Sequence, residues 1–195
     1  MNTLESPLNA MESALLDPAI GYVIILGIAL LFALAGADKL RGLAQFSETF
    51  AAYRVLPDAW GRRLAWLVPC VELAIAITLP WESSRHWAMT AAMALLIAYA
   101  SALGLNLARG RRDLDCGCGT AGNHRPIAAW MVWRNLLLVL ALGIAGVPWV
   151  ARPFNGFDLL TVFGGLAAVV TLYATIDLLL GEVAPQAMSL SRRTR

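Results

Sequence analysis

The run AIGYVIILGIALLFALAGA occupies residues 19–37, contains no charged residue and is closed by Asp38 and Lys39. A helix needs about 20 mostly apolar residues to cross a bilayer, so this run predicts a membrane-spanning helix. Four further apolar segments follow along the chain. We therefore predict an all-α, polytopic transmembrane helix bundle with five spans. The predicted spans are residues 19–37, 64–81, 86–107, 127–150 and 157–180.

Composition favours a membrane protein over a water-soluble domain. The chain has 195 residues, of which 59% are hydrophobic and 14% are charged. Soluble domains carry about 25% charged residues, so this chain has too little polar surface to face water on all sides. Its length suits a single integral-membrane domain over residues 1–195. The formal net charge of +2 points to no nucleic acid or other polyanion, and the expected surroundings are the lipid bilayer.

The tryptophans agree with the predicted span boundaries. All seven lie at or near the ends of spans, where aromatic rings anchor helices among the lipid headgroups. They are Trp60, Trp66, Trp81, Trp87, Trp130, Trp133 and Trp149.

The connector between the first two spans has a helical pattern of its own. Its apolar residues recur at helical spacing through residues 42–56, and Pro57 ends the segment. This pattern predicts a short amphipathic helix lying on the membrane surface. A folded connector packed against the bundle is the alternative.

The cations are distributed unequally between the two sides that five spans define. One side holds Lys39, Arg41, Arg54, Arg62, Arg63, Arg109, Arg111, Arg112, Arg125, Arg192, Arg193 and Arg195, and the other holds Arg85 and Arg152. The positive-inside rule then predicts a multi-pass inner-membrane protein with a periplasmic N-terminus and a cytoplasmic C-terminus. The first nineteen residues contain no Lys or Arg, so we expect no cleavable signal peptide there.

The motif Asp115-Cys116-Gly117-Cys118-Gly119 lies in the polar connector before the fourth span. Two thiols separated by one glycine can close a small, strained disulfide ring, and strain makes such a bond easy to reduce. We therefore predict a redox-active pair, Cys116 and Cys118, whose thiolate fraction depends on Asp115. Two alternatives remain open: a metal site that adds His124 and a fourth ligand, and a pair of unreactive cysteines.

Polar residues inside the predicted spans form a second group of candidates. Glu72 and Arg134 enter the membrane from the same side and reach about 10–12 Å depth at 1.5 Å per residue. Because buried charges usually pair, we predict an ion pair between them. Its role is either structural or functional, such as relaying a proton or holding a quinone head. The same half of the membrane is expected to contain Asp38, Lys39, Cys70, Cys116, Cys118, Asn135 and Asp177.

Cys70 lies two residues before Glu72. A lone cysteine in a span is most often a small buried apolar residue. The alternative is a third redox thiol.

The sequence resembles the MauE family of methylamine-utilisation membrane proteins, within the wider MauE/DoxX pattern. The resemblance rests on DCGCG followed by Ile127, Trp130 and Arg134-Asn135, and on two earlier stretches. Those stretches are LFALAGADKLRGLAQFSETFAAYRVLP and WLVPCVELAIAITLP. Family members commonly read DCGCFG, and the phenylalanine is absent here. The similar region runs roughly from Phe32 to Asn135.

This resemblance implies assistance in maturing the small (beta) subunit of methylamine dehydrogenase, which is rich in disulfides. It also implies a thioredoxin-like partner of the MauD type. The implied activity is thiol–disulfide exchange by Cys116 and Cys118, with a quinone as a candidate electron acceptor. The alternative is a non-enzymatic assembly or transport factor in which the cysteines bind metal or brace the connector.

The implied client matures in the periplasm, whereas the charge distribution places Cys116 and Cys118 on the cytoplasmic side. Two explanations are open. Either electrons pass through the bundle, or the charge rule fails for this chain.

Overall fold

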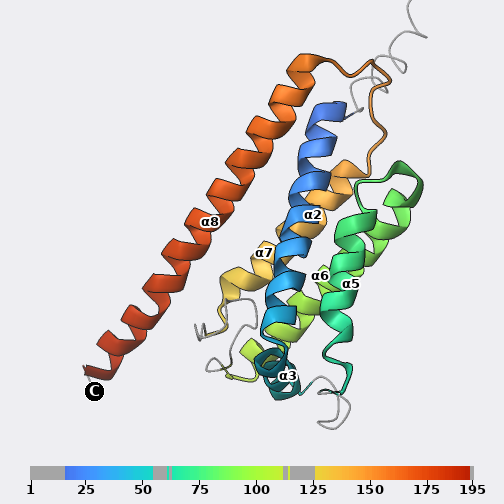
Figure 1. Ribbon diagram of the computed structural model, residues 1–195. Coiled ribbons are helices and arrows are strands. Elements are labelled where there is room, and N and C mark those ends of the chain that lie inside the picture. The colour runs from blue at the N-terminus through green and yellow to red at the C-terminus, as the bar shows by residue number, and fades with distance from the viewer. Residues whose placement is uncertain (1–15, 55–60, 62, 112–113, 115–125, 194–195) are drawn as a thin grey trace, which may run out of the picture.

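The computed structural model describes residues 16–54, 61, 63–111, 114 and 126–193 (Figure 1). Within these residues the chain forms six helices and no sheet, which confirms the predicted all-α class. The helices are α2 Pro18–Arg41, α3 Leu43–Ala52, α5 Leu67–Thr78, α6 Glu82–Ala108, α7 Ala129–Ala145 and α8 Gly156–Arg193.

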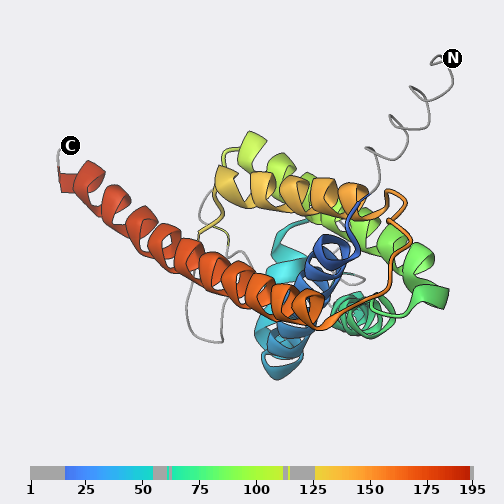
Figure 2. The same cartoon turned by 90° about the horizontal axis from the view of Figure 1, so that it is seen from above.

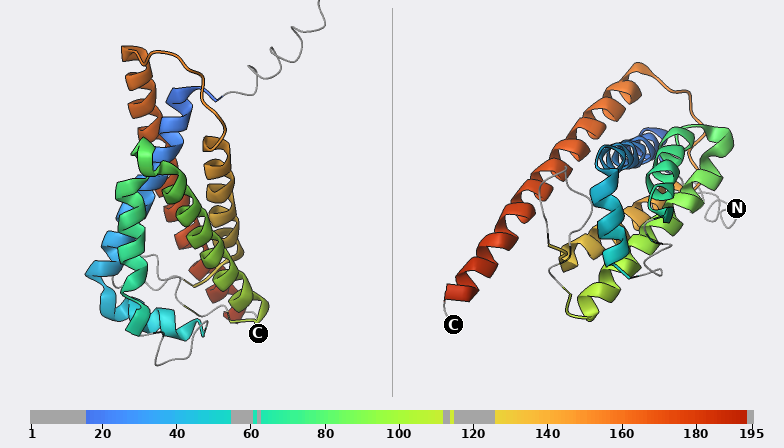
Figure 3. Two further views of the ribbon diagram at one scale, coloured as in Figure 1. Left: turned by 90° about the vertical axis from the view of Figure 1, so that its right-hand side faces the viewer. Right: turned by 60° about the horizontal axis from the view of Figure 1, so that its bottom comes forward.

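Helix α2 occupies the centre of the bundle. It packs against α5, α7 and α8, while α6 packs against α5 and α7. In the left view of Figure 3, α5 and α7 stand on opposite sides of the bundle. Helix α3 follows α2 directly and lies across one end, which we call the α3 end (Figure 1). A helix was predicted within residues 42–56, and the structure confirms it; its position on a membrane surface stays a prediction.

Two of the predicted spans form helices long and apolar enough to cross a membrane. These are α2, with 24 residues, and α6, with 27. The other three predicted spans contain apolar helices that are shorter: α5, α7 and the first part of α8, Gly156–Leu172. Large apolar side chains cover the outside of the described bundle, such as Trp87 at 75% exposed and Leu137 at 62%. An apolar exterior of this kind suits lipid rather than water.

Local signals in the sequence set the ends of α2. Asp17 caps its N-terminus by accepting a hydrogen bond from the Ala19 N–H at 2.8 Å, and Pro18 takes the first helical position, where no N–H is needed. Lys39 and Arg41 lie in the last turn, where positive charge is favoured by the helix dipole.

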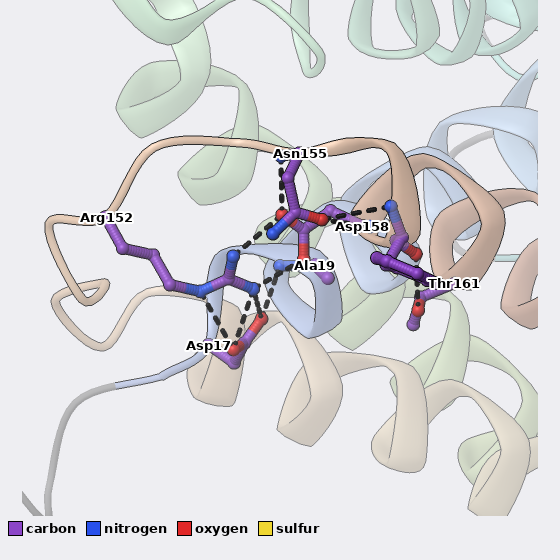
Figure 4. Close-up of polar contacts among 7 residues, drawn as sticks. Asp17, Ala19, Arg152, Asn155, Asp158 and Thr161 are labelled. Atoms are coloured by element: carbon purple, nitrogen blue, oxygen red, sulfur yellow. Dashed lines mark hydrogen bonds and ion pairs between the residues drawn. The ribbon is translucent and has the colours of Figure 1, made fainter.

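The opposite end of the bundle is held by three charged residues, Asp17, Arg152 and Asp158, which we call the clasp (Figure 4). Arg152 Nη2 lies 2.9 Å from Asp17 Oδ1 and 2.6 Å from Asp158 Oδ1. Because Asp17 caps α2 and Asp158 lies in the first turn of α8, the arginine joins the starts of two helices. The hydrogen bonds with Asp158 and Asp17 raise the pKa of Arg152.

Helix α8 crosses α2 by a close approach at glycines. A Cβ on Gly165 would lie 2.8 Å from Val23 Cγ2, and one on Gly27 would lie 3.7 Å from Val169 Cγ1. Small residues allow this kind of contact between helices in membranes. Beyond the crossing, α8 runs away from the other helices (Figures 1 and 2).

Trp149 differs from its predicted role as a headgroup anchor. Its indole packs edge-on against Tyr22 at 5.0 Å between ring centroids, and Arg85 lies over its ring at 4.5 Å. The indole N–H donates to the Ala145 carbonyl at 3.0 Å. Trp149 therefore packs between helices, whereas Trp81 and Trp87 are exposed. The headgroup-anchor role of the exposed tryptophans stays a prediction.

Candidate functional site

A buried ion pair joins α2 to α5 in the half of the bundle nearest α3. Lys39 Nζ donates to both carboxylate oxygens of Glu72, at 2.6 Å and 2.9 Å. Glu72 is 1% exposed and Lys39 is 8% exposed. Tyr99 of α6 donates its hydroxyl to Glu72 Oε1 at 2.6 Å. These three residues, the buried polar cluster, therefore connect three helices.

The Lys39 ammonium also contacts two aromatic rings. It lies 5.7 Å from the centroid of Phe46 in α3 and 5.5 Å from that of Tyr99. Such cation–π contacts stabilise an ammonium that has little water around it. They also attach α3 to the end of the bundle. The arrangement satisfies its own charges and holds these helices together; a further role in relaying a proton or holding a quinone head stays a prediction.

The predicted ion pair between Glu72 and Arg134 is wrong. Within the described residues, the hydrogen-bond partners of Glu72 are Lys39 and Tyr99. Gly36 explains the outcome, because a Cβ there would lie 3.0 Å from Leu73 Cγ. Its small size lets α5 approach α2 closely, and Lys39, three residues later, lies on the same helical face.

Arg134 and Asn135 lie on α7, which packs against α6 and α2. The Arg134 guanidinium lies 5.4 Å from the centroid of the Trp130 ring. Asn135 is 3% exposed and donates to the Met131 carbonyl of its own helix at 2.8 Å. Neither residue is brought to the buried polar cluster by a described contact.

A fully buried asparagine organises the end of α6. Asn106 is 0% exposed, and its Nδ2 donates to the carbonyls of Tyr53 at 3.2 Å and Ala102 at 3.0 Å. Its Oδ1 accepts from Arg111 Nη1 at 3.0 Å. The amide therefore links α6 to the residue after α3 and to the start of the next connector.

The ends of the connector that carries the cysteine motif meet at the α3 end. The Ile127 N–H donates to the Leu114 carbonyl at 3.0 Å. Ile127 belongs to an apolar cluster with Tyr53, Leu103 and Met131, and Leu114 packs against it. Asp115, Cys116, Cys118 and His124 lie outside the described residues, so their redox or metal role stays a prediction.

Cys70 is a free thiol on the exposed face of α5. The predicted buried position is wrong, because α2 and α6 cover Glu72 and leave the side of α5 that bears Cys70 uncovered. Its role as a third redox thiol stays untested. In the described part of the chain, no group of three His, Cys, Asp or Glu side chains is placed to hold a metal ion.

Tyr99 and Asn106 were not among the predicted site residues. Both are polar side chains in an otherwise apolar segment, and this is the signal that could have identified them. The sequence places Lys39 in the correct half of the bundle, but it predicts Arg134 rather than Lys39 as the partner of Glu72.

The model of the family described as Methylamine utilisation protein MauE matches residues 17–149. The chain belongs to the MauE family. It is 36% identical over 187 residues to the methylamine utilization protein MauE of Paracoccus denitrificans, covering 95% of this chain and 100% of the relative. The corresponding protein of Paracoccus versutus is 34% identical, covering 88% of this chain and 92% of the relative. That of Methylophilus methylotrophus is 34% identical, with coverage of 88% and 91%. No solved structure matches.

Membership of the MauE family confirms the resemblance predicted from the motifs. Together with the two helices of crossing length, it identifies the chain as a membrane protein. The range matched by the MauE model begins at Asp17, the cap of α2, and ends at Trp149, before α8. The buried polar cluster and Asn106 therefore lie within the part of the chain that the family shares.

Proposed function

We propose that this MauE-family protein is a membrane thiol–disulfide component of methylamine utilisation, with Cys116 and Cys118 as the exchanging pair. The observation that carries the proposal is the DCGCG motif within the range matched by the MauE model.

The proposed reaction transfers two electrons and two protons from a client dithiol to the Cys116–Cys118 disulfide. One client thiolate attacks a sulfur of the ring and forms a mixed disulfide, and the second client thiolate then releases the reduced pair. The client gains a disulfide and the motif becomes a dithiol. Asp115 affects the thiolate fraction of that dithiol. A quinone dissolved in the bilayer is the class of acceptor that then takes up the two electrons and two protons.

We propose the small subunit of methylamine dehydrogenase as the client and a thioredoxin-like protein of the MauD type as the partner. The relatives are named for methylamine utilisation, which supports a client from that system. The disulfide-rich subunit matches the chemistry of an exchanging dithiol.

We propose five spans in the inner membrane, with the N-terminus in the periplasm and the α3 end facing the cytoplasm. The described cations support this assignment. Six described cations lie in or next to the connectors after α2 and α6, whereas Arg85 and Arg152 lie toward the opposite end with the clasp. The six are Lys39, Arg41, Arg54, Arg63, Arg109 and Arg111. This orientation places the cysteine motif on the cytoplasmic side, whereas direct exchange with a periplasmic client requires the opposite orientation, so these two assignments are alternatives.

The test is replacement of each motif cysteine in a methylamine-growing host, with maturation of the dehydrogenase as the measurement. We expect Cys116→Ser and Cys118→Ser to insert normally and to abolish formation of active dehydrogenase. Cys70→Ser is the matched control, since it removes a thiol from the same protein outside the motif, and we expect it to retain activity.

Thiol trapping in cells separates this function from a non-enzymatic assembly role. A redox component must show both oxidised and reduced populations of the pair. Full maturation of the client by the double serine variant would refute the proposal.

A further inference from the structure

One arginine at the end of the bundle that holds the clasp is not paired with a carboxylate. Arg85 lies near the start of α6, and within the described residues it forms no ion pair, although Glu82 lies only three residues before it. Arg152, at the same end, is bonded to both Asp17 and Asp158. Arg85 therefore keeps a positive charge that can attract an anion from outside the chain.

Aromatic rings from two other segments hold Arg85 in place. Its guanidinium carbon lies 4.5 Å from the centroid of the Trp149 ring and 5.4 Å from that of the Tyr22 ring. The Trp149 ring lies directly against α2, because a Cβ on Gly21 would be only 2.5 Å from Trp149 Cε2. A guanidinium that contacts rings through its face keeps the N–H groups in its plane for hydrogen bonds. The rings therefore fix the position of the charge without neutralising it.

The hydrogen-bond donors of Arg85 are only partly used. Nη2 donates to the Pro80 carbonyl at 3.3 Å. Nε is buried and has no hydrogen-bond partner within the described residues. Nη1 also bonds none of these residues, but it is not buried. A guanidinium presents five N–H donors in a fork that matches phosphate oxygens, so Arg85 can donate to an anion at the protein surface through Nη1 and the second hydrogen of Nη2.

We propose that Arg85 binds the phosphate group of an anionic phospholipid. The proposal goes beyond the exchange reaction and does not involve the cysteines; it rests on the proposed spans, which put this end of the bundle at the bilayer surface. Trp81 and Trp87 flank Arg85 in the sequence and are 66% and 75% exposed. Phe154 packs edge-on against Tyr22 and is 48% exposed. Exposed aromatic rings beside a cation favour a lipid over a soluble anion, because acyl chains can contact the rings while the phosphate bonds the arginine.

The experiment measures lipid binding to full-length protein in detergent by native mass spectrometry. The protein is titrated with phosphatidylglycerol, with phosphatidylcholine of the same acyl chains and with inorganic phosphate. We expect wild type to prefer phosphatidylglycerol, and Arg85→Gln to weaken this binding by about tenfold, because hydrogen bonds between charged groups are lost.

Arg109→Gln is the matched control. It removes an exposed arginine from the opposite end of the same helix, where the side chain has no partner within the described residues. An arginine that no ring holds in place contributes little, so we expect a loss of less than about twofold. Equal losses in Arg85→Gln and Arg109→Gln would show unspecific attraction of lipid to positive charge and would overturn the inference.

Arg85→Lys keeps a cation beside the rings and serves if Arg85→Gln does not fold. An ammonium lacks the planar fork of donors, so we expect a loss of about threefold. Melting temperature without added lipid identifies a purely structural role, in which stability falls while the affinity for phosphatidylglycerol is unchanged.

Unchanged affinity in Arg85→Gln or Arg85→Lys would overturn the inference. So would absence of lipid binding, as expected if Arg85 instead meets a carboxylate of a partner protein. Phosphatidylcholine or inorganic phosphate that binds as tightly as phosphatidylglycerol would overturn the choice of an anionic lipid. The double variant Cys116→Ser/Cys118→Ser should bind lipid as wild type does, so failure of the exchange function is distinguishable from failure of this inference.

Discussion

Each half of the bundle contains a cation paired with carboxylate oxygens, Lys39 with Glu72 and Arg152 with Asp17 and Asp158, but the pairs differ in their access to water. In the buried polar cluster, the Lys39 and Glu72 side chains are 9% and 1% exposed. In the clasp, the Arg152 and Asp17 side chains are 29% and 43% exposed. Water can solvate Arg152 or Asp17 when either loses its partner, whereas it cannot reach Glu72. Asp158, at 8% exposed, is buried too, but it also accepts a hydrogen bond from the Asn155 N–H. The same type of interaction is therefore expected to affect stability very differently at the two ends.

The largest expected effect comes from breaking the buried pair. Removing one partner leaves an uncompensated charge in a low-dielectric interior, which typically costs about 3–5 kcal/mol. We expect Lys39→Met, which leaves the Glu72 carboxylate buried, to lower the yield and thermal stability of detergent-purified protein by this order. The double variant Lys39→Met/Glu72→Leu should recover much of the loss, because apolar pairs can replace buried ion pairs.

Additivity of the two single changes provides the check. If the losses from Lys39→Met and Glu72→Leu simply summed in the double variant, the residues would not interact in the protein. The larger effect expected for the buried pair than for the clasp could then not be attributed to the Lys39–Glu72 interaction.

A smaller effect is expected at Tyr99, which donates a hydrogen bond to the same carboxylate. Tyr99→Phe removes the hydroxyl and keeps the ring beside Lys39. Hydrogen bonds to charged groups contribute about 1.5–3 kcal/mol, so we expect a loss in that range by thermal unfolding in detergent. Phe46→Leu is a useful companion, since it removes a ring from Lys39 without touching a hydrogen bond. A Tyr99→Phe protein as stable as wild type would show that Lys39 alone satisfies Glu72.

The smallest effect is expected at the clasp. Arg152→Gln should lower the melting temperature less than Lys39→Met does, because the Asp17 side chain is 43% exposed and the buried Asp158 keeps its hydrogen bond from the Asn155 N–H. The pKa of Arg152 is raised by its hydrogen bonds with Asp158 and Asp17. Because the pKa of Arg152 is higher in the folded protein than in the unfolded chain, its ion pairs stabilise the fold fully at pH values below the ordinary arginine pKa. This stabilisation is lost only as the pH rises through the pKa of the folded state.

The difference between wild type and Arg152→Gln should therefore stay constant from neutral pH to about pH 10, below the ordinary arginine pKa. Melting curves at several pH values check this. If Arg152→Gln lowered thermal stability as much as Lys39→Met does, the clasp and the buried polar cluster would not differ in their contributions to stability.

The amino-acid sequence by itself determined which segments are helical and roughly where each residue lies along its helix. Runs of apolar residues predict helices, and a rise of about 1.5 Å per residue converts sequence position into depth. This is why Lys39 and Glu72 were assigned to the same half of the membrane. The MauE resemblance also came from motifs in the linear chain.

Only the tertiary structure decided which faces meet. The close approach at Gly36 turns Lys39 toward Glu72, and Arg134 lies on α7, across the bundle from α5 (Figure 3). Cys70 proved exposed and Trp149 packed between helices for the same reason. In an evenly apolar helix the sequence carries little information about rotation, because no polar face distinguishes inside from outside. Rotation is then set by the neighbours that pack against the helix, which exist only in the folded protein.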